Sequence, residues 1–142
     1  MIRSELRFET WDLCLALRAG GMAADERARA LFGAGATAAE LFTAAKEGDS
    51  AASAWVLEAQ EYIAMAVSYA ALLLDPRVIV FGGGVACAQG EWLLGPIREL
   101  SSRFLLGQPE IRLSTLGPNA QLLGAARLAL DSVRNAHKRV LG

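Results

Sequence analysis

The longest stretch of helical apolar spacing in the chain covers residues 49–74. Asp49 or Ser50 provides an N-cap, since either side chain can accept a hydrogen bond from the first free backbone amides. Pro76 cannot continue a helix. The pattern therefore predicts one long helix that ends at about Leu74. Its apolar residues recur every three or four positions and share one broad face: Trp55, Val56, Tyr62, Ile63, Val67, Ala70 and Leu74.

The apolar pattern changes directly after this helix. Val78–Phe81 is a continuous apolar run, which is typical of a strand covered on both faces, and Ile111–Ser114 is a shorter candidate strand. Gly95-Pro96 should interrupt a helix near its start. Strands that alternate with helices in the second half predict an α/β fold with parallel strands. Shorter helices are predicted over residues 5–18, 25–32, 37–46, 92–106 and 119–138.

Two of these shorter helices begin with a capping residue. Thr37 and Glu40 have the spacing of a capping box, in which each side chain accepts from the backbone amide of the other residue. Asn119 is a capping residue for the last helix. Both signals are local, so they predict where these helices begin but not what the helices pack against.

Length and charge exclude several classes of partner. The 142 residues suffice for one domain, and 14 basic against 15 acidic residues leave a net charge of −1. This balance gives no reason to expect nucleic acid or an anionic membrane as a partner. The most apolar run, residues 62–74, is shorter than the roughly 18 residues of a membrane-spanning helix. The first residues lack an apolar signal core, so we expect a cytoplasmic protein.

The chain is apolar for its size and poor in metal ligands. Its mean hydropathy of +0.31 predicts surface that is buried against a partner, such as a second copy in a homo-oligomer. Cys14 and Cys87 are far apart and are interpreted as reduced packing residues. Cys14 has no second cysteine at ligand spacing, and His137 stands alone. A tetrahedral zinc site needs a full set of ligands, so we expect no zinc and no other metal site.

The three consecutive glycines at positions 82–84 are the most informative feature of the chain. They follow the apolar run Val78–Phe81 directly. Glycines at the end of a strand allow positive φ angles and let a flat ligand approach the backbone closely. The pattern is neither G-x-G-x-x-G nor a P-loop, so a tight turn between strand and helix is an alternative to nucleotide contact. Trp92 follows closely enough to border an adenine pocket.

From about Thr37 to Leu130 the sequence resembles the C-terminal portion of ROK proteins, a family of repressors and sugar kinases. The resemblance rests on segments that occur in the family's order. These are Asp49 before an Ala-rich helix, Leu73-Leu74-Asp75-Pro76 leading into Val78-Ile79-Val80-Phe81-Gly82-Gly83-Gly84-Val85-Ala86, then Leu94-Gly95-Pro96-Ile97-Arg98, Leu116-Gly117, and Leu122-Leu123-Gly124-Ala125-Ala126. Residues 1–35 match the family poorly, so we divide the chain into this segment and a ROK-like lobe over residues 36–142.

The resemblance implies the C-terminal lobe of an actin-like, ribonuclease-H-like ATPase fold, rich in helices with a short parallel sheet. In that fold two lobes close over ATP and a sugar. Gly82, Gly83, Gly84 and the adjoining Val85 fall on the motif that lines the adenosine. The segment Gly124-Ala125-Ala126 falls on a helix that crosses its counterpart in the other lobe, although close helix packing alone would also explain its small residues.

The resemblance also shows what this sequence lacks. A ROK sugar kinase uses an Asp-x-Gly-x-Thr phosphate loop and a catalytic aspartate, because a sugar hydroxyl is a poor nucleophile until a base accepts its proton. Neither is present, and no catalytic residue is assigned. We therefore expect half of an ATP site, with Mg²⁺ only in a complete protein, and no activity of the chain alone. The alternative is the sugar-sensing and oligomerisation part of a ROK repressor.

Overall fold

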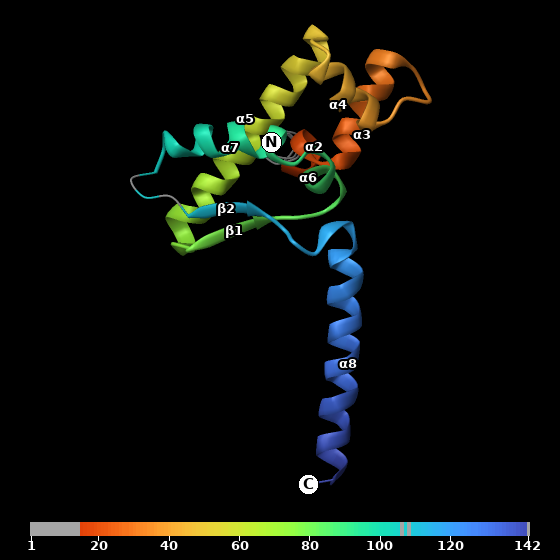
Figure 1. Cartoon of the computed structure of the whole chain (residues 1–142), viewed down its shortest axis with the longest axis vertical. Helices are drawn as coiled ribbons and strands as arrows, with labels where there is room; N and C mark the ends of the chain where they lie inside the picture. The colour runs from red at the N-terminus through yellow and green to blue at the C-terminus, as the bar shows by residue number, and fades with distance from the viewer. Residues whose placement is uncertain (1–14, 106, 108, 142) are drawn as a thin grey trace, which may run out of the picture.

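The computed structural model describes residues 15–105, 107 and 109–141, but not the side chains of residues 118 and 135–141. Helices α3, α4 and the first half of α5 gather at one end, the two strands lie at the other, and α8 extends away from the body (Figure 1). The elements are α2 (Leu15–Ala19), α3 (Gly21–Phe32), α4 (Ala38–Lys46), α5 (Ser50–Leu74), β1 (Val78–Phe81), α6 (Gly84–Gln89), α7 (Glu91–Ser102), β2 (Glu110–Leu113), η1 (Gly117–Asn119) and α8 (Ala120–Leu141).

Helix α5 is the long helix that the sequence predicts. Asp49 caps it, because its carboxylate accepts from the amide of Ala52 at 2.8 Å. Asp75 ends it in the left-handed conformation, with φ 43° and ψ 52°. The predicted apolar face is wrong at its end, since Leu74 is 76% exposed. The last turn of α5 projects beyond the elements that cover its middle.

The starts of α3 and α4 are linked by one carboxylate. Glu40 accepts from the amide of Thr37 at 2.7 Å, which confirms the predicted start of α4. Helix α3 begins at Gly21, four residues before the predicted position, so Asp25 lies within it. The Asp25 side chain reaches across to α4 and accepts from the amide of Ala38 at 2.7 Å. Asp25 is therefore a residue within α3 whose carboxylate binds the first amide of α4.

Two hydrophobic clusters share α5 and form the core. The first joins α3, α4 and the first half of α5, and it is built largely from alanine, which lets the helices approach closely. The second joins the second half of α5 to α7 and the strands. Val85 packs against both clusters. The buried members of the first are Ala24, Ala28, Ala36, Leu41, Phe42, Ala45, Ala52 and Val56, and those of the second are Ala64, Val67, Leu93, Leu94, Ile97 and Ile111.

The two strands form a parallel pair, as the sequence predicts. Their register runs from Val78 opposite Glu110 to Phe81 opposite Leu113. Strand β2 therefore lies one residue earlier than predicted. The expectation that β1 is covered on both faces is wrong for the described residues, since Val80 is 54% exposed. The elements α5 and α7 pack on one side of the sheet, and the described chain leaves the Val80 side open.

Helix α7 continues through Gly95-Pro96, where a break was predicted. Pro96 lacks the amide that would bond to the carbonyl of Trp92, but this loss falls within the first two turns. The fully buried Leu94 and Ile97 hold the segments on either side of the proline against the core. Burial of an apolar side chain contributes about 1.5–3 kcal/mol, so two such anchors offset the missing hydrogen bond. The helix ends at Ser102.

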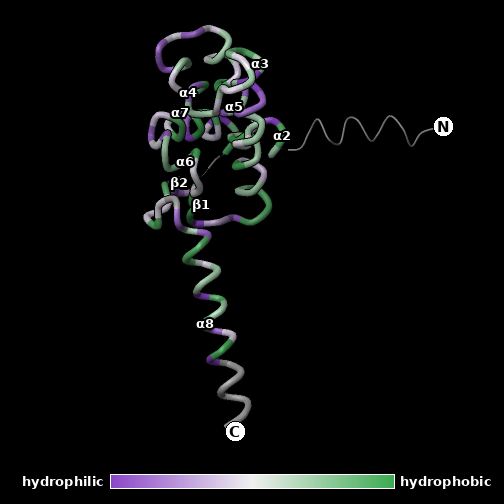
Figure 2. Tube along the Cα trace, turned by 90° about the vertical axis from the view of Figure 1, so that its right-hand side faces the viewer, coloured by the Kyte–Doolittle hydropathy of each residue, from purple (hydrophilic) through white to green (hydrophobic). Residues whose placement is uncertain are grey.

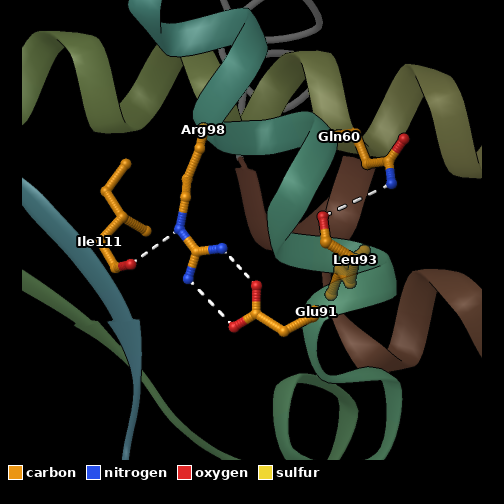
Figure 3. A network of polar contacts seen from close by, with 5 residues as sticks. All are labelled: Gln60, Glu91, Leu93, Arg98 and Ile111. Carbon is orange, nitrogen blue, oxygen red and sulfur yellow. Dashed lines mark hydrogen bonds and ion pairs between the residues drawn. The ribbon is translucent and has the colours of Figure 1, made fainter.

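Polar contacts fix α7 on both sides (Figure 3). The Nε of Arg98 donates to the carbonyl oxygen of Ile111 in β2 at 2.8 Å. Its two terminal nitrogens contact the carboxylate of Glu91, one of them at 3.1 Å. On the other side, the buried amide of Gln60 donates to the carbonyl oxygen of Leu93 at 3.5 Å. Helix α7 therefore connects α5 to the sheet.

Helix α8 extends from the body without covering it. In both views it leaves the strand end of the molecule and runs alone (Figures 1 and 2). Asn119 is not a simple cap but the last residue of the 3₁₀ turn η1, which leads into α8. Gly124, Ala125 and Ala126 are exposed, and no described atom lies near a Cβ placed on Gly124. Large apolar side chains on α8 are exposed as well: Leu122, Leu123, Leu128, Leu130 and Val133.

The predicted helix over residues 5–18 lies mostly outside the described residues, and only its end corresponds to α2.

Among the described helices, none combines the length and the hydropathy of a membrane-spanning segment.

Candidate functional site

The triple glycine forms the turn from β1 into α6. Gly83 precedes α6 with φ 90° and ψ 173°, a conformation that glycine adopts readily and other residues rarely do. Gly82 lies against the end of the second strand, because a Cβ on it would be 3.5 Å from the Cβ of Ser114. The local geometry therefore explains the glycine at position 83, whereas a Cβ at position 82 would make an ordinary contact with Ser114.

Gly84 has no such explanation. It lies in α6 with ordinary backbone angles, and no atom of the described chain lies within 4 Å of a Cβ placed on it. Alanine is the better helix former, by about 1 kcal/mol in a helix interior and by less at a first helical residue such as this one. The space beside Gly84 is open and the backbone there is bare, which is the arrangement that permits close approach of a flat group.

The carboxyl ends of both strands lie at this edge. The amide of Ser114 donates to the carbonyl oxygen of Phe81 at 2.7 Å, so the chain leaves β2 beside the glycine loop. The Ser114 hydroxyl accepts from the amide of Leu116 at 3.2 Å, and η1 then contacts α6. In open α/β sheets, ligands bind outside the carboxyl ends of the strands. The structure thus brings Gly82–Val85 and residues 114–119 together.

Sequence reasoning assigned no ligand role to Ser114. The only signal was its place at the end of a strand parallel to β1, since two parallel strands end at the same edge of a sheet. The combined edge carries no charged residue, because residues 82–85 read Gly-Gly-Gly-Val and residues 114–119 read Ser-Thr-Leu-Gly-Pro-Asn. An edge without cations or carboxylates suits a nucleoside better than a polyphosphate or its metal.

The side chains of Val85 and Trp92 are held elsewhere. Val85 packs toward the two core clusters, so only its backbone faces the turn. The ring of Trp92 packs edge-on against Phe42 with centroids 6.3 Å apart, and the ammonium of Lys46 lies 5.0 Å from its centre. These partners belong to α4. A role of Trp92 beside an adenine stays a prediction.

No other cavity or group of potential metal ligands in the described residues lies at the edge that carries the glycine loop. A cavity of about 670 Å³ lies at the opposite end of the sheet, between the ends of α5 and α7, and is lined in part by Asp75, Arg77 and Leu105. No three histidine, cysteine, aspartate or glutamate side chains of the described residues lie close enough to hold a metal ion. Cys87 is a free thiol, and Cys14 lies outside the described residues.

Known proteins are similar to this chain in sequence and in fold. The family model "ROK family" matches residues 11–132. The bifunctional enzyme NanE/NanK of Brucella melitensis is 38% identical over 93 residues, which cover 65% of this chain and 18% of that protein. The ROK hexokinase from Thermus thermophilus superposes with a TM-score of 0.72 at 35% identity, over 86% of this chain and 42% of that one.

A second solved structure is a ROK family glucokinase from Streptomyces griseus in complex with glucose and AMPPNP. It has a TM-score of 0.67 at 30% identity and covers 81% of this chain and 44% of that one. The chain thus spans less than half the length of each of these relatives. The expected C-terminal lobe of an actin-like fold is confirmed by these superpositions. With most of its length matched by the family model, the chain belongs to the ROK family.

Proposed function

We propose that this chain is the part of a ROK sugar kinase that contacts the adenosine of ATP, with Gly82, Gly83, Gly84 and the backbone of Val85 lining the nucleoside. In the complete enzyme the γ-phosphate of ATP passes to a hydroxyl of a hexose with the help of Mg²⁺. Both solved relatives named above are sugar kinases, and one is in complex with the nucleotide analogue AMPPNP. This favours a kinase over the repressor that the sequence left open.

The observation that carries the proposal is the open space beside Gly84. Neither φ nor a neighbouring atom requires glycine there, yet the backbone is bare where the two strands end. A nucleoside that packs against this backbone would account for the absence of a side chain at position 84. Residues 82–85 and 114–119 carry no charge, which favours binding of the adenosine rather than the phosphates at this edge.

The same edge limits what the chain does alone. Transfer to a sugar hydroxyl needs a base and positioned positive charge around the phosphates. The edge supplies neither, and the 142 residues contain no Asp-x-Gly-x-Thr phosphate loop. We propose that the chain by itself does not phosphorylate hexoses, and that the phosphate groups and Mg²⁺ are held by a complementing lobe.

Two exposed apolar surfaces support a complementing lobe. Val80 on the uncovered side of β1 is 54% exposed, and Leu122 at the start of α8 is 70% exposed. Both surfaces flank the edge that carries the glycine loop, and apolar surface of this kind marks contact with another body. We also propose that the chain self-associates, because its high mean hydropathy is matched by a further apolar surface on α5.

Calorimetric titration with ATP tests the nucleotide site. The variant Gly84→Val places a branched side chain in the open space, and Gly35→Val is its control, because Gly35 also has no atom within 4 Å and lies in the loop before α4. We expect Gly84→Val to weaken ATP binding at least about tenfold, or ~1.4 kcal/mol, and Gly35→Val to bind like the original chain. Equal affinity in all three proteins would remove the site assignment.

A phosphorylation assay tests the second half of the proposal. Purified chain, ATP, Mg²⁺ and glucose should give no ADP above a control without protein. Turnover that exceeds this control and disappears with Gly84→Val would show that the chain contains its own catalytic base, contrary to the proposal.

A further inference from the structure

A polar cavity lies among α2, α3 and the first half of α5. It encloses about 370 Å³, and most of its lining is polar. We call it the Arg27 pocket and define it by Leu17, Arg18, Glu26, Arg27, Trp55 and Glu58. None of its lining residues belongs to Gly82–Val85 or to residues 114–119, so the pocket is separate from the edge that carries the glycine loop.

The guanidinium of Arg27 has no counter-ion in the described chain. Its Nε is shielded from water, yet no described atom accepts a hydrogen bond from it. None of the ion pairs between described residues involves Arg27. A charged group that has lost water costs free energy unless an opposite charge or a hydrogen bond replaces the water. The fold therefore holds an uncompensated cation at the wall of a cavity.

The carboxylates of the surrounding helices do not compensate this charge. Asp25 accepts from the first amide of α4 at 2.7 Å. Glu58 of α5 lies 3.6 Å from Arg18. Glu26 directly precedes Arg27 in α3, and successive residues of a helix do not face each other. A counter-ion for Arg27 must therefore come from outside the described chain.

We propose that the Arg27 pocket binds a small monocarboxylate. Because Nε is covered, the carboxylate oxygens accept from the two terminal nitrogens of Arg27, in the bidentate arrangement that suits a planar guanidinium. Glu26 and Glu58 line the same cavity, and each would repel a second negative charge on the ligand. This repulsion favours a carboxylate with a single charge over phosphate or a dicarboxylate.

Trp55 and Leu17 determine what else the ligand carries. The indole of Trp55 lines the pocket and packs edge-on against Phe42, with ring centroids 6.3 Å apart, so its position is fixed. Leu17 lines the pocket as well and is 47% exposed. A flat or apolar carbon skeleton on the carboxylate would cover both side chains. The volume of about 370 Å³ falls within the usual range of sites for small ligands.

Titration with acetate and benzoate tests the pocket in the full chain. The NMR resonances of the Arg27 Nε–H and the Trp55 indole N–H report on its two walls. We expect both resonances to shift and saturate with either acid, and benzoate to bind more tightly because its ring contacts Trp55. Benzamide has the shape of benzoate without the charge. Benzamide and inorganic phosphate should each bind at least about tenfold more weakly than benzoate.

Two arginine variants on the same helix show whether the charge of Arg27 is needed. Arg27→Met keeps an unbranched side chain but removes the cation, and it should weaken benzoate binding at least about tenfold. Arg29→Met changes an exposed arginine of α3 and should bind like the original chain. Since Arg27→Met removes a charge that has no partner, it should fold without ligand, which circular dichroism checks. The comparison with benzamide tests the same charge without any substitution.

Thermal unfolding provides a second readout. A ligand that binds only the folded chain stabilises it, so saturating benzoate should raise the melting temperature of the original chain and of Arg29→Met but not of Arg27→Met. Failure of both acetate and benzoate to bind, as expected if a carboxylate of the protein itself occupies the pocket, would overturn the proposal. Equal affinity for benzoate and benzamide, or an Arg27→Met variant that binds benzoate normally, would do the same. Binding there does not require nucleotide, and ATP titration of the same proteins reports separately on the glycine loop.

Discussion

Arg98 bonds directly to the main chain of Ile111, with its Nε 2.8 Å from the carbonyl oxygen. This contact joins α7 to β2 on the side of the strand that β1 does not occupy. Figure 3 shows the same guanidinium facing the carboxylate of Glu91 with its other two nitrogens. The planar fork of arginine satisfies a carbonyl and a carboxylate at once, which a lysine cannot do. The contact helps to hold the sheet whose far edge carries the glycine loop.

We predict that Arg98→Met destabilises the chain. The variant keeps most of the aliphatic stem but loses the bond to Ile111, and a hydrogen bond from a charged group contributes about 1.5–3 kcal/mol, less at a half-exposed site. Urea unfolding should show a loss of about 1 kcal/mol. The control is Arg103→Met, whose ion pair with Glu99 is exposed and should be worth less than about 0.5 kcal/mol. Equal losses in both variants would contradict the role of Arg98.

The Glu91–Arg98 pair predicts a weak dependence of stability on pH. The hydrogen bond from Arg98 holds the pKa of Glu91 below its ordinary value of 4.5. A carboxylate whose pKa is lowered on folding stabilises the protein above its unfolded pKa, and this stabilisation is lost as the pH falls through the folded value. The unfolding free energy of Glu91→Gln should therefore fall less between pH 5 and pH 3 than that of the original chain. An identical dependence of the unfolding free energy on pH in both proteins would show that the Glu91–Arg98 pair does not stabilise the fold.

Substitution by alanine should have opposite effects on stability at two neighbouring glycines. Gly83 has φ 90° and ψ 173°, a region that other residues almost never adopt, so Gly83→Ala should lower the unfolding free energy by about 1–3 kcal/mol. Gly84 has ordinary helical angles and open space beside it, so Gly84→Ala should be neutral or stabilise the chain by up to about 1 kcal/mol. Thermal unfolding of both variants checks this difference. A destabilised Gly84→Ala would mean that the chain itself requires glycine there, which would remove the main support for a ligand.

Substitution of a leucine by alanine should lower the unfolding free energy much more on α7 than on α8. Leu94 is fully buried, so Leu94→Ala should cost about 2–5 kcal/mol of unfolding free energy. Leu128 is 71% exposed on the free-standing α8, and Leu128→Ala should change stability by less than about 0.5 kcal/mol. Urea unfolding monitored by tryptophan fluorescence measures both. A large loss for Leu128→Ala would show that α8 packs on the body of the chain in solution.

Signals that act within a few residues predicted the fold well. Asp49 and the Thr37–Glu40 pair mark helix starts because a cap bonds to amides of its own first turn. Predictions that depend on tertiary contacts failed. Pro96 does not break α7, because buried neighbours on both sides anchor the helix, and the strand containing Val80 is covered on only one side by the described chain. Neither fact can be read from a single segment.

In the candidate site, too, local features could be predicted from the sequence and tertiary contacts could not. The run Gly82–Gly84 is visible in the sequence, and its place after β1 follows from the apolar run before it. That Gly83 needs glycine for its backbone angle whereas Gly84 does not became clear only from the coordinates. Ser114 joins the site through strand pairing across about 30 positions of sequence, from Phe81, and no local pattern encodes such a contact.

The central claim is that adenosine packs against the bare backbone after β1. Mapping of amide chemical shifts by NMR during titration with ADP tests it most directly, because each backbone amide reports its own surroundings. The account predicts that the largest shifts fall on Gly82–Val85 and on residues 114–119. Shifts confined to another surface, such as the exposed residues of α5 around Tyr69, would contradict it.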